Sequence, residues 1–342
     1  MKKFSSALLA ALFSLVGVQA QSHRSCGSHE HLLEQIAKDP SMAARMEQME
    51  AHTEKFAKSS ASKERVVYTI PVVVHVVYNT TAQNISDAQI QSQLTVLNND
   101  FRKLNADASL IPSNFAGVAA DCEINFCMAQ RTPTGAATTG IIRKQSTVTA
   151  WSTNDAVKYT AQGGSDAWDR NQYLNIWVCN MSGGILGYAQ FPGGAAATDG
   201  VVCLYTAFGT TGTASAPFNK GRTATHEVGH WLNLRHIWGD ATCGSDLVSD
   251  TPTHNEENYG CPAAGHLSTC AGTPVEMTMN YMDYTDDACM YMFSAGQKTR
   301  MQAVIASGGA RATLATSLGC QAPSTTGCGT PASLTATSIT TT

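Results

Sequence analysis

HEVGHWLNLRH, residues 226–236, is the stretch that decides the fold. His226 and His230 stand four residues apart and therefore project from one face of a helix, where both imidazoles can hold one metal ion. The third histidine, His236, cannot share that straight helix, so the chain must bend after His230. Such a bend usually needs a residue with positive φ, and Asn233 is, after glycine, the most tolerant residue type. The pattern predicts a zinc site with three histidine ligands.

Three protein ligands leave the fourth zinc position open, as in catalytic rather than structural zinc sites. Zinc lowers the pKa of a bound water toward ~7 and polarises a scissile carbonyl, and Glu227 stands beside the ligands to take the proton. The alternative is a chance HExxH on an ordinary helix, but the third histidine at this distance in an exported chain argues against it. The motif predicts a zinc-dependent hydrolase with Glu227 as catalytic base.

Export is indicated by the first twenty residues, MKKFSSALLAALFSLVGVQA. Two lysines precede an apolar run, and Val18-Gln19-Ala20 is a small-x-small cleavage site, so residues 1–20 are typical of a signal peptide. The run is too short for a membrane anchor, and no later stretch is long and apolar enough to span a bilayer. With 43% hydrophobic residues and a net charge of −4, the chain can bury a core and offers no basic stripe for nucleic acid.

The rest of the chain divides by composition. Residues 21–64 are polar and rich in His, Glu, Lys, Ala and Met, which predicts one or two amphipathic helices in a pro-segment. At Arg65 the composition changes to VVYTIPVVVHVVY, residues 66–78, a β-branched run typical of a buried strand. Further strands are expected at 122–130, 173–181 and 200–208, with an edge strand at 183–189. Helices are expected from Ser86, from about Thr223, and over 294–307.

Two strings together, HEVGHWLNLRHIWGD (226–240) and NYMDYTDDACM (280–290), resemble the metzincin metallopeptidases and, within them, the pappalysin family. The resemblance covers roughly residues 65–315. It implies an α+β fold in which a twisted, mostly parallel sheet with backing and active-site helices lies above the cleft. An irregular, disulfide-stapled part lies below. It also implies a secreted zinc endopeptidase made as a zymogen. The family has glycine where this chain has Asn233.

The resemblance assigns roles in the second string. Met282 matches the methionine of the Met-turn beneath the zinc, although packing in a methionine-rich core is a compatible interpretation. Tyr284 matches a tyrosine that steadies the oxyanion. Asp287 matches an acidic residue at the bottom of the primed-side specificity pocket, which predicts cleavage before Arg and secondarily before Lys. Asp283 and Asp286 can share that role, and a solvated acidic turn is the alternative.

The family pattern also pairs the cysteines of the lower part, Cys243 with Cys270 and Cys261 with Cys289. A second, structural zinc is the rival, but the spacings give no CxxC knuckle. Cys320 and Cys328 can close a small local loop. Cys122 and Cys127 are too far apart along one strand to pair with each other. Their partners, and those of Cys179 and Cys203, cannot be deduced from the sequence.

A calcium site is implied just after the third histidine, in GSDLVSDTP, residues 244–252. Short acidic and hydroxyl side chains suit calcium, which takes six to eight oxygen ligands. Asp246 and Thr251 match the calcium ligands of the family, and Asp250 is a weaker candidate. A plain Asx-type turn is the alternative.

Latency is indicated by Cys26, near the start of the pro-segment. A thiolate there can take the fourth zinc position, as in the cysteine switch of latent metzincins, and Gly27 lets the backbone pass close to the metal. A lipidated or stray thiol is the alternative, but a lipobox cysteine would directly follow the signal cleavage site. Release would follow cutting near Ser62-Lys63 or Glu64-Arg65, and both bonds precede a basic residue, so the enzyme can process itself.

Residues 316–342 are assigned to a linker and the start of a truncated fibronectin III-like module, with a simple flexible tail as the other open interpretation. The expected partners are protein or peptide substrates, with no nucleic acid, no membrane span and a monomeric state. An inactive binding module on the same scaffold would be favoured only if Glu227 were replaced. A surface adhesin whose key part follows Thr342 is compatible with the protease.

Overall fold

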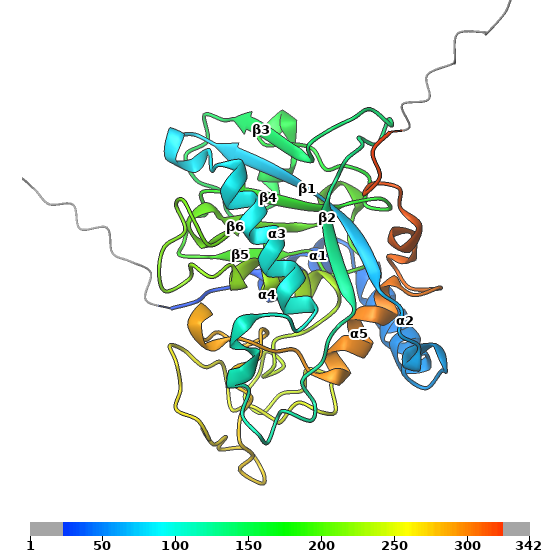
Figure 1. Ribbon diagram of the computed structural model, residues 1–342, viewed down its shortest axis with the longest axis vertical. Coiled ribbons are helices and arrows are strands. Elements are labelled where there is room, and N and C mark those ends of the chain that lie inside the picture. Colours follow the sequence, from blue (N-terminus) through cyan, green and yellow to red (C-terminus); the bar gives the residue numbers. More distant parts are fainter. Residues whose placement is uncertain (1–22, 324–342) are drawn as a thin grey trace, which may run out of the picture.

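The computed structural model describes residues 23–323. The signal peptide assigned to residues 1–20 and residues 324–342 of the C-terminal assignment therefore lie outside the described residues. The upper part of the molecule is a six-stranded sheet in the order β2-β1-β4-β6-β5, with β3 also paired to β1 (Figure 1). Its strands are β1 (Tyr68–Tyr78), β2 (Ile124–Met128), β3 (Ile141–Gln145), β4 (Leu174–Cys179), β5 (Gly187–Ala189) and β6 (Val201–Leu204). All these pairings are parallel except that of β5 with β6.

Strand β1 is the centre of the sheet because both of its faces are covered. Val72, Val74 and Val76 lie in the main hydrophobic core, whereas Val73 and Val77 lie in clusters on the opposite face. This explains why its sequence is a nearly continuous apolar run rather than an alternation. The predicted mostly parallel α+β arrangement is confirmed.

Two helices lie against the sheet, α3 (Asp87–Phe101) and α4 (Arg222–Trp231). The Ser86 side chain caps α3 by accepting a hydrogen bond from the backbone N–H of Gln89, as predicted. Helix α4 packs against α3, β5 and β6. The Thr225 hydroxyl donates to the buried Asp100 carboxylate of α3 at 2.7 Å, and Arg222 pairs with the same carboxylate at 3.0 Å. These contacts fix the orientation of α4.

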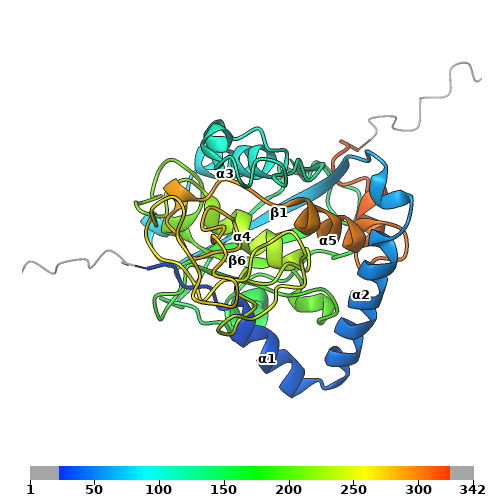
Figure 2. The ribbon, with the colours of Figure 1, turned by 90° about the horizontal axis from the view of Figure 1, so that it is seen from below.

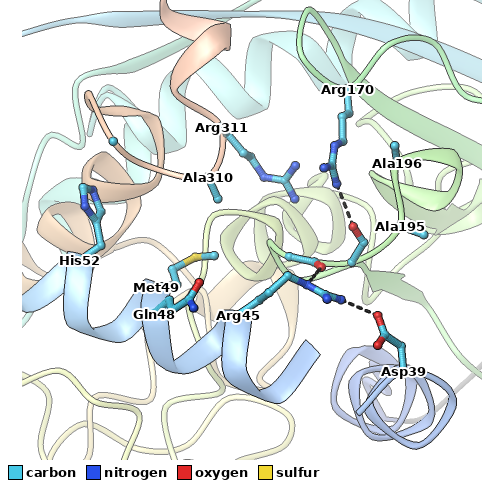
Figure 3. A pocket seen from close by; sticks show the side chains of 13 residues that line it. Asp39, Arg45, Gln48, Met49, His52, Arg170, Ala195, Ala196, Ala310 and Arg311 are labelled. Carbon is cyan, nitrogen blue, oxygen red and sulfur yellow. Dashed lines mark hydrogen bonds and ion pairs between the residues drawn. The ribbon is translucent and has the colours of Figure 1, made fainter. Parts of the chain in front are cut away.

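An N-terminal segment, residues 23–64, wraps around this body (Figure 2). Its helices are α1 (Ser28–Lys38) and α2 (Ser41–Ala57), followed by the short 3₁₀ helix η1 (Ala61–Lys63). Helix α2 lies beside α5 (Ala295–Ile305), and a cavity of about 590 Å³ remains between the middle of α2 and the body (Figure 3). Among the described residues, none of the helices has the length and apolar composition that crossing a membrane requires.

The lower part of the molecule, residues 239–293, consists mainly of irregular loops (Figure 1). Two disulfides hold these loops together. Disulfides join Cys243 to Cys270 and Cys261 to Cys289, the two pairs that the resemblance implied. A third disulfide joins Cys127 of β2 to Cys320, so the suggested local loop between Cys320 and Cys328 is wrong. It also fastens the first residues of the assigned linker to the sheet. Four cysteines are free and buried: Cys26, Cys122, Cys179 and Cys203.

Candidate active site

The three histidines converge because helix α4 ends early. His226 and His230 leave one face of α4, which ends at Trp231. The chain then turns at Asn233, whose φ of 71° is the positive value that the motif predicted, and returns His236 to the same place. A Cβ added at Gly229 would lie 2.5 Å from the Met282 sulfur, so glycine is needed for the chain around Met282 to pass directly beneath α4.

Each imidazole is oriented through its Nδ1 atom. His226 Nδ1 donates to the Tyr281 carbonyl at 2.7 Å, and His230 Nδ1 donates to the Leu234 carbonyl at 2.8 Å. His236 Nδ1 donates to the Asp240 carboxylate. A carbonyl can only accept, so the Nε2 atom opposite it carries a lone pair. The Nε2 atom of His230 lies 3.1 Å from those of both His226 and His236. Three lone pairs therefore point at one spot.

This donor set fits zinc. Four ligands at 2.0–2.1 Å in a tetrahedron stand roughly 3.3 Å apart, close to the spacing of these nitrogens. Lone pairs this near one another repel unless a cation lies between them. The Cys26 sulfur completes the group, because its Sγ and the three histidine ligand atoms all lie within 4.8 Å of one another, and all four residues are buried. Burial, with the nearby Glu227 carboxylate, raises the pKa of the Cys26 thiol well above its usual value, so the thiolate needs such a cation.

The N-terminal segment also contacts the groups expected to perform catalysis. The Ser28 hydroxyl donates to Glu227 Oε2 at 2.9 Å, and Cys26 Sγ lies 3.4 Å from the same oxygen. The Tyr284 hydroxyl accepts from the backbone N–H of Cys26 and donates to its carbonyl, both at 3.2 Å. Burial raises the pKa of Glu227 to about 7. The segment therefore covers both Glu227 and Tyr284.

The backbone of this segment extends the sheet. The Leu186 N–H donates to the Ser25 carbonyl at 2.8 Å, and the Gly27 N–H donates to the Gly187 carbonyl at 2.9 Å. Cys26 and Gly187 form a parallel bridge, and β5 is an edge strand. An extended chain can thus be held in the cleft through main-chain groups alone.

A second buried pocket holds Arg24. Its guanidinium donates to Asp287 Oδ1 at 2.5 Å, to the Thr223 hydroxyl at 3.1 Å and to the Thr285 carbonyl at 3.2 Å. The Phe218 ring lies 5.2 Å from the guanidinium carbon. Two backbone N–H groups, of Lys220 and Arg222, donate to Asp287 Oδ2 at 2.7 and 3.2 Å. Arg24 and Asp287 are 2% and 0% exposed, so the pair is shielded from water.

The remaining acidic residues of the predicted specificity and calcium sites lie outside the Arg24 pocket. Asp283 is buried and accepts from the backbone N–H of Asn258 at 2.8 Å, so it belongs to the lower part rather than to the Arg24 pocket. The Thr251 hydroxyl donates to Asp246 at 2.9 Å, and burial raises the pKa of Asp246 to about 6. Asp250 accepts from the Ser294 hydroxyl and caps α5, which separates it from that pair.

Four residues that contact the site were not predicted from the sequence: Arg24, Ser28, Thr223 and Phe218. A signal existed for Arg24 alone: a basic residue two positions before the predicted zinc-binding thiol, in a chain whose Asp287 was expected to bind a guanidinium. Thr223 and Phe218 carry no motif, because a hydroxyl or a ring acquires its role only when the fold places it beside the pocket.

Known proteins are similar to this chain in sequence and in fold. Residues 158–306 match the peptidase M43 family model, described as pregnancy-associated plasma protein-A. An extracellular metalloprotease of Pyricularia oryzae is 32% identical over 314 residues, which cover 89% of this chain and 96% of that protein. A promirolysin mutant of Tannerella forsythia is 46% identical with a TM-score of 0.79, covering 86% of this chain and 97% of that one. Mature mirolysin of the same organism, in complex with a cleaved peptide, is 50% identical with a TM-score of 0.71, covering 73% and 96%.

Proposed function

The chain belongs to the peptidase M43, or pappalysin, family of extracellular zinc metalloproteases, and from this premise we propose that it is a secreted endopeptidase that cuts before Arg, and secondarily before Lys. We further propose that residues 21–64 are a pro-segment that keeps the catalytic domain, residues 65–315, latent until it is removed. Its substrates are proteins and peptides, and we propose that it acts as a monomer.

The proposed chemistry uses the groups that the N-terminal segment covers. When held by the three histidines, zinc would polarise the peptide carbonyl and lower the pKa of a water molecule. Glu227 takes a proton from the attacking water and delivers it to the leaving amine. The Tyr284 hydroxyl, which donates to the Cys26 carbonyl in the latent state, donates to the substrate carbonyl oxygen as it gains negative charge.

Arg24 in the Asp287 pocket carries the proposed specificity. The pocket meets the planar guanidinium with three acceptors in different directions and covers it with Phe218. A lysine ammonium can still reach the carboxylate as a point charge, but its donors share one nitrogen and cannot reach three acceptors that are spread around a planar guanidinium. This difference supports a preference for Arg with Lys as a secondary choice.

Three peptides that differ only in Arg, Lys or norleucine after the scissile bond test the proposal. The mature enzyme should cut the Arg peptide fastest, and a chelator should abolish cleavage until zinc is restored. Thr223→Val should lower kcat/KM for the Arg peptide by roughly tenfold, the value of one hydrogen bond to a charged group, and change the Lys peptide less. Equal rates on all three peptides would contradict the specificity.

The Cys26 switch has its own test. In the Glu227→Ala background the zymogen should stay intact, whereas Cys26→Ala with Glu227 present should mature sooner than the wild-type zymogen. Ser28→Ala is the matched control, because it removes a contact to Glu227 but leaves the thiol in place. If Cys26→Ala and wild-type zymogens mature at the same rate, the thiol does not maintain latency.

We also propose calcium at Asp246 and Thr251. A buried carboxylate whose pKa is raised to about 6 by lack of solvent fits a site where a cation would favour the charged form. Calcium at about 100 times its dissociation constant should stabilise the protein by about 2.7 kcal/mol. Thermal unfolding with and without calcium measures this, and Asp246→Asn should remove the increase in Tm. An unchanged Tm in the unsubstituted protein would sink the proposal.

A further inference from the structure

Asp155 is a carboxylate beside β5 that the N-terminal segment covers. Its Oδ2 atom accepts from Nε2 of His31, in α1, at 2.9 Å. Its Oδ1 atom contacts two groups of the body, the Lys158 ammonium at 2.8 Å and the Tyr188 hydroxyl at 3.2 Å. We propose that Asp155, once freed from His31, binds a basic side chain of the substrate at the third residue before the cut. The inference rests on the proposed function, in which the N-terminal segment leaves and cleavage precedes Arg.

The N-terminal segment and a substrate run through the cleft in opposite directions. Arg24 fills the Asp287 pocket, and Cys26, two residues later, reaches the three histidines. In a substrate cut before Arg, the reacting carbonyl belongs to the residue that precedes the Arg in the chain. A substrate with its Arg in the same pocket therefore runs antiparallel to β5, whereas Cys26 pairs with β5 in parallel. Residues 25, 26 and 27 then lie where the first, second and third residues before the cut would lie.

The side chains of an extended chain point alternately to opposite sides. Arg24 and Cys26 point to the specificity pocket and to the histidines, so Gly27 faces the opposite wall of the cleft. A Cβ atom built on Gly27 would lie 2.6 Å from the Thr153 methyl group and 3.5 Å from Tyr188 Cβ. Glycine lets the segment pass closer to this wall than a substrate residue could. The third side chain before the cut faces the same wall, and the second faces away from it.

The Tyr188 side chain connects this wall to Asp155. Its Cβ lies next to Gly27, and its hydroxyl, at the far end of the ring, contacts Asp155. The apolar stem of a long basic side chain can lie along the ring and bring its charged end to the carboxylate. The N-terminal segment has no side chain at residue 27, and it reaches Asp155 from α1 instead. There the His31 ring lies 4.9 Å from the Tyr188 ring.

Space for such a side chain exists beside Asp155. A cavity of about 260 Å³ borders the carboxylate. Asn154 and Tyr159 line it on the side of the body, and Gln35 and Met42 line it on the side of α1 and α2. The second group leaves with the N-terminal segment, so the body side of the cavity opens toward an incoming substrate.

Lys158 keeps the carboxylate in place without using all of its acceptor capacity. Lys158 is 0% exposed and donates to the Thr198 carbonyl at 2.7 Å, so it stays with the body when the segment leaves. A carboxylate has two oxygens that accept about four hydrogen bonds, and Oδ2 can therefore accept from a second cation. Because Lys158 already balances the charge of Asp155, we expect a modest preference of about fivefold, as for a partly exposed charge pair.

Peptides with Arg after the scissile bond and Lys, norleucine or Glu three residues before it provide the test. The mature enzyme should cut before Arg with kcat/KM about fivefold higher for Lys than for norleucine, which has a similar stem without the charge. The Glu peptide should be cut more slowly than the norleucine peptide. Mass spectrometry of the products separates cleavage before Arg from any cleavage before Lys. The same three residues placed two positions before the bond are the matched control and should differ little.

Variants of the mature enzyme assign the preference to Asp155. Asp155→Asn should remove the advantage of the Lys peptide, and Asn tolerates the positive φ of 65° at this position. Asp166→Asn, at an exposed position, is the control and should keep the advantage. Asp155→Asn alone leaves the buried Lys158 without its counter-charge. A second variant, Asp155→Asn with Lys158→Met, therefore removes both charges and should lack the advantage as well.

Three results would overturn the inference: equal rates for Lys and norleucine at the third position, the same gain from Lys at the second position, or a gain that survives in both Asp155 variants. The norleucine peptide separates this inference from the proposed function. If it is cut before Arg but Lys brings no gain, only the inference about Asp155 fails. If it is not cut before Arg, the proposed specificity fails.

Discussion

Two of the three acceptors that orient the histidines of the proposed zinc site are backbone carbonyls, and the third is the side chain of Asp240. Substitution cannot remove the carbonyls of Tyr281 and Leu234, but it can remove the Asp240 carboxylate that holds His236. Groups that hold the far nitrogen of a ligating histidine fix its tautomer and ring orientation. Asp240 is thus the place where zinc affinity can be changed without touching a ligand.

Asp240→Ala should weaken zinc binding by about 10–100-fold, because His236 loses the acceptor that directs its Nε2 toward the metal. Competition between the mature enzyme and a chelator measures the affinity. Glu256→Ala, which removes an exposed carboxylate from the same irregular part, is the control and should bind zinc as the wild type does. An unchanged affinity in Asp240→Ala would mean that packing alone orients His236.

The contrast between Asn233 and Arg24 shows what a sequence reveals about single residues. The positive φ of Asn233 was predictable because the spacing of three histidines leaves only one short stretch in which the chain can bend. The contact of Arg24 with Asp287 joins residues 263 positions apart. Local sequence patterns do not predict contacts at this separation. The Asp287 pocket could therefore be assigned by resemblance, but Arg24 could not be identified as the residue that fills it.

At the scale of elements, α2 is fastened to the body by one buried charge. Arg300 of α5 donates to both oxygens of Glu50 at 2.8 Å, and it also donates to the Asn233 carbonyl at 3.2 Å. Arg300 is 5% exposed. The N-terminal segment is thereby linked to the bend that positions His236. Two further polar contacts of α2 lie beside the cavity: Arg45 donates to the Gly193 carbonyl at 2.7 Å, and the His52 ring lies 3.0 Å from the Ala303 carbonyl (Figure 3).

Glu50→Gln should destabilise the zymogen by about 1–3 kcal/mol, because it leaves a buried guanidinium without its counter-charge. Differential scanning calorimetry should show Tm lower by a few degrees. Glu54→Gln is the control one turn further along α2, where the carboxylate forms an exposed pair with Lys58. Mature enzyme from both variants should be identical, since cutting removes both positions. A Glu50→Gln zymogen as stable as the wild type would rule out the anchor.

The strands differ in how readily they can be predicted from the sequence. Strand β1 is predictable because both of its faces are buried, so its sequence is a long run of β-branched residues. Strand β3 has the sequence IIRKQ and is half exposed along its length, so no apolar run marks it, and it was not predicted. Its pairing with the second half of β1 depends on β2 ending early, which is a property of the assembled sheet.

At the scale of the whole molecule, the irregular lower part is joined to the cleft by a buried polar cluster. Asp283 accepts from Asn258, whose side chain also donates to Glu276 at 2.7 Å. His254 lies 3.6 Å from the same Asp283 carboxylate. Burial, reinforced by Glu276, raises the pKa of Asp283 to about 8. Because Asp283 precedes Tyr284, its protonation state bears on the cleft.

The raised pKa of Asp283 predicts a pH dependence of stability. The folded state binds a proton that the unfolded chain, with a carboxyl pKa of about 3.9, has already lost. The stabilisation is therefore complete below about pH 4 and is lost as pH rises through about 8, at up to about 1.4 kcal/mol per pH unit. Asp283→Asn should flatten this slope when Tm is measured from pH 4 to 8, and Asp166→Asn, at an exposed position, should not. An equal slope in Asp283→Asn and the wild type would contradict the assignment.

The disulfides show which cysteine pairings the sequence can and cannot predict. The two pairs of the lower part follow from a family pattern, whereas Cys127 and Cys320 are 193 residues apart and come together only because η9 (Ala312–Thr316) returns the chain to β1. Several cysteines offer many pairings, and only the folded backbone selects among them.

The parallel bridge between Cys26 and Gly187 has a consequence for the range of targets. Once the pro-segment leaves, β5 presents an open row of amides and carbonyls at the rim of the cleft. Every polypeptide carries the same backbone, so such a rim cannot tell one protein from another. With the proposed preference for Arg, the enzyme would act wherever an arginine lies on an unfolded or exposed stretch, because the Asp287 pocket is the main feature of the cleft that distinguishes one side chain from another. Its selectivity among proteins then reflects the local flexibility of each target more than a recognition motif.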